Sequence, residues 1–228
     1  MSQNFTRLVK KQLVDLFNGM GFKKKGFCFY KRITDQVSLT ISYMVASRQE
    51  VGHVYVSPDI GILRHDIGRI YEKYKGYPIT ATVCTSLGYI MPCKKWYEFD
   101  FVENDDNVGV LEEIKNNIIT HGYVFCKNLE TLDEIENYYS LNTGSFEIYY
   151  LPIIYYLQGN KEKGIEYIEA QIAKNKQKGE KTKVTYSEVN TEEYHEETYH
   201  VHQYDNEYER FYEFFRQLPE KYNLEDWK

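Results

Sequence analysis

Several features that would identify a secreted, membrane-spanning or metal-binding chain are missing from this sequence. Its four cysteines are widely spaced and form no Cys-x-x-Cys pair, so the closely spaced ligands of a zinc site are absent. The N-terminus carries no apolar signal segment, and no apolar run reaches the length of a membrane span. We therefore expect a cytoplasmic protein without a membrane partner, whose thiols are reduced and buried as small hydrophobic residues.

Catalytic fingerprints are missing as well. The sequence has no Gly-x-Ser-x-Gly elbow, no phosphate-binding glycine loop, no dinucleotide fingerprint and no His-Glu-x-x-His pair. A nucleophilic pair of Cys84 or Cys93 with His53 or His65 stays open, because such partners meet in space, but no local signature supports it. We predict no cofactor and favour a protein that is not an enzyme.

What the chain does contain is charge of both signs, unevenly distributed. The net charge of the 228 residues is −6, yet residues 1–50 carry +6 and residues 186–228 carry −8. A uniformly basic surface, which nucleic-acid-binding proteins present, is therefore excluded, and no nucleic-acid partner is predicted. Seven of the 23 tyrosines lie in the acidic segment, at positions Tyr186, Tyr194, Tyr199, Tyr204, Tyr208, Tyr212 and Tyr222.

Patterns of apolar residues predict an α+β fold: an N-terminal helix, a mostly antiparallel β-sheet with helices packed on one face, and a helical C-terminal half. A domain over residues 1–140 and a helical region over residues 141–228 are expected, or one continuous domain. Helical spacing predicts helices over 5–17, 67–74, 108–119, 128–139, 146–157, 165–173 and 206–218. Alternation predicts strands over 27–30, 37–45, 51–57, 60–63, 80–85, 86–91 and 96–101, with 123–126 as a strand or a link.

The C-terminal half starts with a pair of helices. The Gly159-Asn160 step interrupts two helical patterns, and the pair resembles a single tetratricopeptide-type hairpin, although one unit does not make a solenoid. After it we expect an exposed loop at 177–181, a strand-like piece at 182–186 and a polar stretch up to a final aromatic helix. The aromatic face of that helix must dock on another surface, most simply on the parent domain.

Residues 19–32 contain a motif with two possible relatives. Lys25-Gly26-Phe27-Cys28-Phe29 resembles the core of an RNA-recognition strand, but the match fails because Cys28 replaces a Gly or Ala and Arg32 stands at the last aromatic position. The wider pattern resembles the bacterial domain of unknown function 4304 over residues 1–130. The matching residues are Gly21, Phe22, Lys23, Lys25, Gly26, Phe29 and Arg32.

That resemblance implies no known activity and no catalytic residues. Some small acidic bacterial α+β proteins of this sort are similar to immunity proteins, which neutralise a toxin by covering its active site. The resemblance does not extend beyond Ser140.

The acidic segment carries the first functional hypothesis, in which a non-enzymatic domain binds a basic protein partner such as a toxin. Complementary charge accelerates encounter, and tyrosines anchor interfaces. The predicted binding residues are Glu192, Glu193, Tyr194, Glu196, Glu197, Tyr199 and Tyr204.

The alternative hypothesis is a metal-binding module or a metal-dependent hydrolase. His200 and His202 share a face if their segment is extended, and His195 lies close by in the sequence. Imidazoles with neighbouring carboxylates suit zinc or a related divalent ion.

Overall fold

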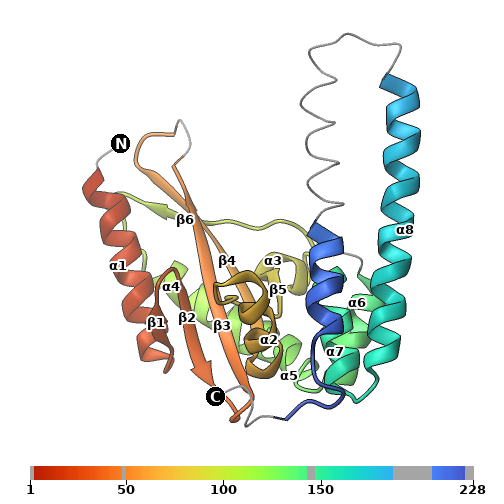
Figure 1. The fold of residues 1–228 in the computed structure, drawn as a ribbon. Coiled ribbons are helices and arrows are strands. Elements are labelled where there is room, and N and C mark those ends of the chain that lie inside the picture. The colour runs from red at the N-terminus through yellow and green to blue at the C-terminus, as the bar shows by residue number, and fades with distance from the viewer. Residues whose placement is uncertain (1–2, 48–49, 143–146, 187–206, 224–228) are drawn as a thin grey trace. The chain divides into compact units, whose positions relative to one another are not determined.

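The computed structural model describes residues 3–47, 50–142, 147–186 and 207–223 (Figure 1). The chain divides into two compact units. Unit 1 comprises residues 1–68 and 79–135, and unit 2 comprises residues 69–78 and 136–228. The architecture confirms the predicted fold class, with an N-terminal helix, an antiparallel sheet and a helical C-terminal half.

Unit 1 is built around the sheet, which has six antiparallel strands among the described residues. Their order is β1–β2–β3–β4–β5, and β6 pairs with the first part of β4. The strands are β1 (Lys23–Lys25), β2 (Cys28–Arg32), β3 (Val37–Ala46), β4 (His53–Arg64), β5 (Val83–Ser86) and β6 (Phe99–Val102). The helices are α1 (Gln3–Gly19), α3 (Leu87–Ile90), α4 (Val108–Asn117), the π-helical turn η1 (Ile118–Gly122) and α5 (Tyr123–Lys127).

Helices cover one face of this sheet, and strand register shows which face it is. Phe29 of β2 is paired with Ile41 of β3, which is paired with Ile60 of β4, so the three side chains share a face. Phe17 of α1 packs edge-on against Phe29, with ring centroids 5.0 Å apart. The backbone of Gly122 in η1 lies against the side chain of Ile60, where a Cβ would overlap it. Phe17, Phe29, Ile41, Ile60 and Gly122 are all buried, and they belong to the core of unit 1.

Unit 2 is helical. It contains α7 (Glu147–Leu157), α8 (Lys161–Tyr186), a helix over residues 207–216, the last turns of α2 (His65–Lys75) and most of α6 (Leu132–Leu141). The predicted break between α7 and α8 is confirmed: Gly159 has a φ of 83°, which favours glycine, and the Asn160 side chain accepts a hydrogen bond from the Lys163 N–H.

An aromatic cluster fills the core of unit 2. Phe211, on the helix over residues 207–216, has its ring centroid 4.9 Å from that of Tyr74 in α2 and 5.0 Å from that of Tyr149 in α7. Tyr71 packs edge-on against Tyr149 and Tyr150. The aromatic face of the last helix therefore docks onto α2 and α7.

Five features of the structure differ from the sequence predictions. Residues 87–90 form helix α3 instead of a strand, because Gly88 packs against the backbone of Lys95 and Tyr97, and this tertiary contact overrides strand propensity. Residues 123–126 lie in α5. The predicted loop and strand-like piece at 177–186 continue α8, because the three lysines, the glutamate and the glutamine of that stretch are good helix formers and outweigh Gly179. Strand β1 was not predicted at all, and β4 runs through Pro58 without a break.

The cysteines fall into two pairs by exposure. Cys28 and Cys126 are buried, as predicted, whereas Cys84 and Cys93 are exposed, which corrects the expectation that all four are buried. Cys126 donates its thiol hydrogen to the Gly61 carbonyl at 3.3 Å, and burial raises its pKa to about 12.

We predict that an aromatic disulfide reagent at pH 8 modifies two thiols of the native protein, Cys93 first and Cys84 more slowly, and the other two only after unfolding. The reagent reacts with thiolate, so burial and a high pKa both protect Cys126. Burial of its sulfur and the nearby Asp59 carboxylate also raise the pKa of Cys84, so less of this thiol is ionised and it reacts more slowly. The rates are followed by absorbance, with Cys84→Ser and Cys93→Ser as assignments; rapid modification of all four thiols would contradict the prediction.

Candidate functional site

The residues predicted to bind a basic partner, and those predicted to bind a metal, lie outside the described residues. The first group is Glu192, Glu193, Tyr194, Glu196, Glu197, Tyr199 and Tyr204, and the second is His195, His200 and His202. Within the part of the chain that the structure describes, no three His, Cys, Asp or Glu side chains are grouped to hold a metal ion. The metal hypothesis stays a prediction.

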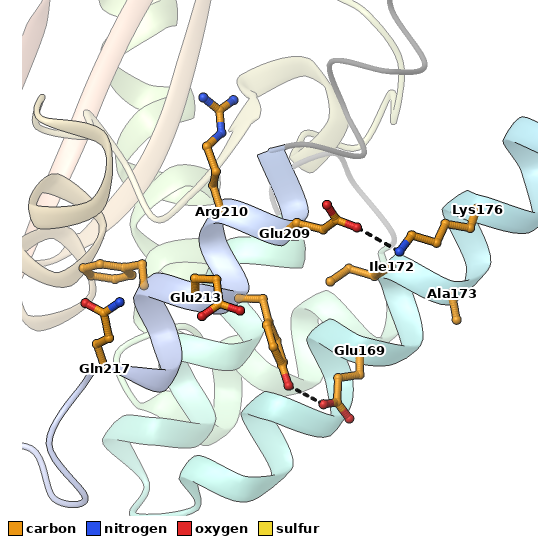
Figure 2. A pocket seen from close by; sticks show the side chains of 10 residues that line it. Glu169, Ile172, Ala173, Lys176, Glu209, Arg210, Glu213 and Gln217 are labelled. Carbon is orange, nitrogen blue, oxygen red and sulfur yellow. Dashed lines mark hydrogen bonds and ion pairs between the residues drawn. The ribbon is translucent and has the colours of Figure 1, made fainter.

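Unit 2 contains a groove between α8 and the helix over residues 207–216 (Figure 2). One wall is formed by α8 and the other by the acidic helix that follows the predicted binding segment. Its lining combines carboxylates, two cations and apolar side chains: Glu169, Ile172, Ala173, Lys176, Glu209, Arg210, Tyr212, Glu213, Phe214 and Gln217.

Two polar contacts join the walls of the groove. The Tyr212 hydroxyl donates to Glu169 Oε1 at 2.5 Å, and Lys176 Nζ lies 2.8 Å from Glu209 Oε1 (Figure 2). The hydrogen bond to the Glu169 carboxylate raises the pKa of Tyr212, since ionisation would place two negative charges together. Both contacts are exposed, so they fix side-chain geometry more than they add stability.

Two lysines hold the ends of the helix over residues 207–216. Lys75 of α2 forms an ion pair with Glu207, and its ammonium lies over the rings of Tyr74 and Tyr149, at 5.0 and 4.8 Å from their centroids. Burial lowers the pKa of Lys75, and the nearby Arg210 lowers it further. At the other end Lys161 of α8 donates to the carbonyls of Arg216 and Leu218, at 3.1 and 2.6 Å. A cation at a helix C-terminus satisfies free carbonyls and complements the helix dipole.

Close packing also fixes the distance between the walls. Gly164 of α8 faces Phe215, and a Cβ added to this glycine would lie 2.7 Å from the phenylalanine ring and 3.1 Å from the Pro152 carbonyl oxygen. Sequence periodicity finds Ile172 and Phe214 as helix-face residues. Nothing in the sequence, however, marks Gly164 as the point of closest approach.

In unit 1 the sheet face opposite the helices is polar. Tyr30, Ser42, Asp59 and Cys84 are on this face by strand register, and the Ser42 side chain is hydrogen-bonded to Asp59. Burial raises the pKa of the Asp59 carboxyl, and burial together with the neighbouring Cys28 raises the pKa of Tyr30 to about 12. A protonated carboxyl and a phenol can each donate a hydrogen bond, but they do not by themselves define a site or a reaction.

The Cys–His pairs left open by the sequence have other partners in the described residues. His53 Nδ1 lies 3.0 Å from both carboxylate oxygens of Asp100, and His65 Nε2 lies 2.9 Å from Ser38 Oγ. The structure therefore gives both imidazoles oxygen partners instead of the Cys84 or Cys93 thiol that nucleophilic catalysis requires.

Comparison with known proteins adds no relative: no family model, no curated protein and no solved structure matches this chain. The resemblance to the domain of unknown function 4304 stays a prediction. No helix among the described residues combines the length and the apolar character needed to cross a membrane.

We predict that Gly164→Ala lowers the free energy of unfolding by about 1–3 kcal/mol, because the methyl group overpacks the Phe215 contact. Helix propensity alone predicts the opposite sign, since alanine in a helix interior is favoured over glycine by about 1 kcal/mol. Urea unfolding measures the change. The matched control is Gly109→Ala in α4, where no atom lies within 4 Å of the added Cβ and stability should be unchanged or higher. Equal stability of the two variants would refute the close approach.

Unit 2 should lose stability at alkaline pH. Burial raises the pKa of Tyr71, Tyr74 and Tyr149 above the ordinary value of about 10. The stabilisation is complete below that value. It is lost as pH rises through the raised pKa values, because the unfolded chain then releases protons that the folded unit retains. We expect the urea midpoint, followed by far-ultraviolet circular dichroism, to fall above pH 10. A smaller fall is expected in Tyr74→Phe, which cannot ionise there, and an unchanged pH dependence would contradict this assignment.

Proposed function

We propose that this protein is a non-enzymatic binding domain whose acidic, tyrosine-rich C-terminal surface engages a basic protein, as an immunity protein engages a toxin. The observation that supports it best is the groove between α8 and the helix over residues 207–216. Three glutamates line this groove beside apolar and aromatic side chains. The helix that carries two of them lies within the acidic segment at 186–228.

The chemistry of the groove fits a basic partner. Glu169, Glu209 and Glu213 are exposed, so a lysine or arginine of a partner can approach them from solvent. Two of these carboxylates already accept from Tyr212 and Lys176, and they keep further acceptor positions, because a carboxylate has about four lone-pair sites. The charge of −8 over residues 186–228 attracts a basic partner toward this surface and raises its association rate.

Apolar area supplies the second part of binding. Ile172, Tyr212 and Phe214 are half-buried in the groove, and each has area left to bury under a partner. Tyrosine is enriched among residues that dominate binding energy, because its ring buries a large area while its hydroxyl remains hydrogen-bonded. The lysine contacts at both ends of the helix hold this surface in place before binding, so little ordering cost remains.

The test is a pull-down from native cells with the full chain as bait, at low and high salt, followed by calorimetry with the purified partner. We expect one basic protein that is lost at high salt. Glu169→Lys/Glu213→Lys should raise its Kd about tenfold or more, because like charges then face the partner. The Glu-to-Lys variant at Glu192, Glu193, Glu196 and Glu197 should act in the same direction.

The matched control is Asp105→Lys/Glu112→Lys, which makes the same change in net charge on exposed residues of unit 1. It should leave the Kd within about twofold, because neither side chain lines the groove. An acidic partner, or a basic partner whose Kd and salt dependence are the same for all variants, would exclude the proposal.

A further inference from the structure

The hairpin of β1 and β2 displays a phenylalanine at its tip. Lys25 is paired with Cys28, so Gly26 and Phe27 form a two-residue turn. Gly26 has a φ of 62°, whereas Phe27 has no positive φ, which is the pattern of a type II′ turn with glycine at its first central position. The turn fixes Phe27 at the apex, where its side chain is 96% exposed, more than any other large apolar residue of the described chain.

Basic residues surround this apex. Lys23, Lys24 and Lys25 form the edge strand β1 and are all exposed. Two further basic residues of β2 are engaged elsewhere, since Lys31 donates to the Met20 carbonyl and Arg32 pairs with Asp35, so the charge near the apex is that of the β1 lysines. On the adjoining helix α1, Arg7, Lys10 and Lys11 are exposed too. Lysines on an edge strand also prevent unwanted strand pairing, but that role does not explain a phenylalanine held out in water at the end of the same hairpin.

We propose that this hairpin docks on an anionic lipid bilayer, with Phe27 inserted into the interface and the lysines of β1 against the headgroups. The apex is convex, so the ring can enter a bilayer without displacing the strands behind it. Strand geometry places Lys25 to Lys23 within about 13 Å of Phe27, close enough to contact headgroups while the ring is inserted. No spanning helix is needed for such a contact, so the expectation of no membrane partner, which rested on the absence of a spanning segment, does not address it.

Single-stranded nucleic acid fits this surface less well. Sequence-tolerant binding of single strands uses several exposed aromatic rings in a basic groove. Phe22 and Phe29, the aromatic neighbours of Phe27, are 2% and 0% exposed, and Phe29 is covered by Phe17 of α1. One isolated ring on a convex tip provides no stacking platform.

The test is co-sedimentation of the full chain with vesicles of phosphatidylcholine containing about 30% phosphatidylserine, against pure phosphatidylcholine. We expect binding to the anionic vesicles alone, weaker at about 0.5 M than at about 0.1 M salt. Phe27→Ser should lower the partition constant by about tenfold or more. Lys23→Gln/Lys24→Gln/Lys25→Gln should lower it about a hundredfold, or roughly fivefold per lysine.

Two control variants match these changes. Leu141→Ser removes an exposed apolar side chain, 84% accessible, from α6. Lys94→Gln/Lys95→Gln/Lys127→Gln removes three exposed charges from elsewhere in unit 1. Both should bind like wild type. Because Phe27 is exposed, Phe27→Ser should also keep the wild-type melting temperature, which separates lost binding from lost folding.

Insertion has its own readout. In Phe27→Trp the added indole should shift its fluorescence to the blue on anionic vesicles and be quenched by brominated lipid, relative to the background of Trp96 and Trp227. The proposal would be overturned if the protein did not bind anionic vesicles or bound both compositions equally. It would also be overturned if the control variants lost as much binding as the hairpin variants. So would a single-stranded oligonucleotide that binds the hairpin more tightly than vesicles and displaces it from them. The groove variants of unit 2 change no residue of the hairpin and should leave vesicle binding unchanged, so the two proposals can fail independently.

Discussion

The pairing of β3 with β4 is the constraint on which unit 1 depends. Ten consecutive pairs, from Val37 with Arg64 to Ala46 with Tyr55, fix which side chains face the helices. A slip of β3 by one residue along β4 would turn Ile41 to the polar face and Ser42 toward the core. Since β2 pairs with β3, and both β5 and β6 pair with β4, the same register sets the position of every other strand except β1, which follows from β2.

In unit 2 the interactions that stabilise the helix over residues 207–216 differ in free energy from those that orient its side chains. Burying a phenylalanine contributes about 1.5–3 kcal/mol, and Phe211 and Phe215 are both fully buried. An exposed ion pair such as Lys176 with Glu209 contributes about 0–1 kcal/mol. Aromatic packing therefore holds the helix over residues 207–216 in place. The lysines at its ends and the two contacts across the groove determine how its glutamates are presented.

Sequence patterns predict the elements of this protein well wherever one face of a helix or strand is uniformly apolar. The helices that became α1 and α7, and the strand that became β3, follow directly from their spacing. Sequence patterns fail where a tertiary contact determines the local structure. The contact of Gly88 with Tyr97 bends residues 87–90 into a helix, and the contact of Gly164 with Phe215 sets the width of the groove. Strand β1 was missed because three lysines have low strand propensity, and only pairing with β2 makes them a strand.

The predicted binding residues lie outside the described residues, so the groove is a candidate that sequence reasoning did not identify. The charge of residues 186–228 indicates a surface for a basic partner, but the carboxylates placed in the groove come from two helices, and Glu169 belongs to neither the acidic segment nor its neighbours in sequence. Its place beside Tyr212 depends on the α7–α8 turn at Gly159 and on the closeness of α8 to Phe215. Spacing within one helix cannot reveal a pair of that kind.

Net charge is a poor guide to the partners of a chain with this distribution. A total of −6 predicts repulsion from an anionic bilayer, yet at physiological ionic strength a charge acts over only about 8 Å. The β1 edge of the hairpin is a cationic surface, because Lys23, Lys24 and Lys25 are consecutive and exposed, whereas Arg32 at the far end of β2 is offset by Asp35. The local charge of the groove in unit 2 is set in the same way by the side chains that line it, which include three glutamates. Local charge, together with the side chain that each surface leaves exposed, is the basis on which we propose a basic protein as the partner of the groove and an anionic interface as the partner of the hairpin.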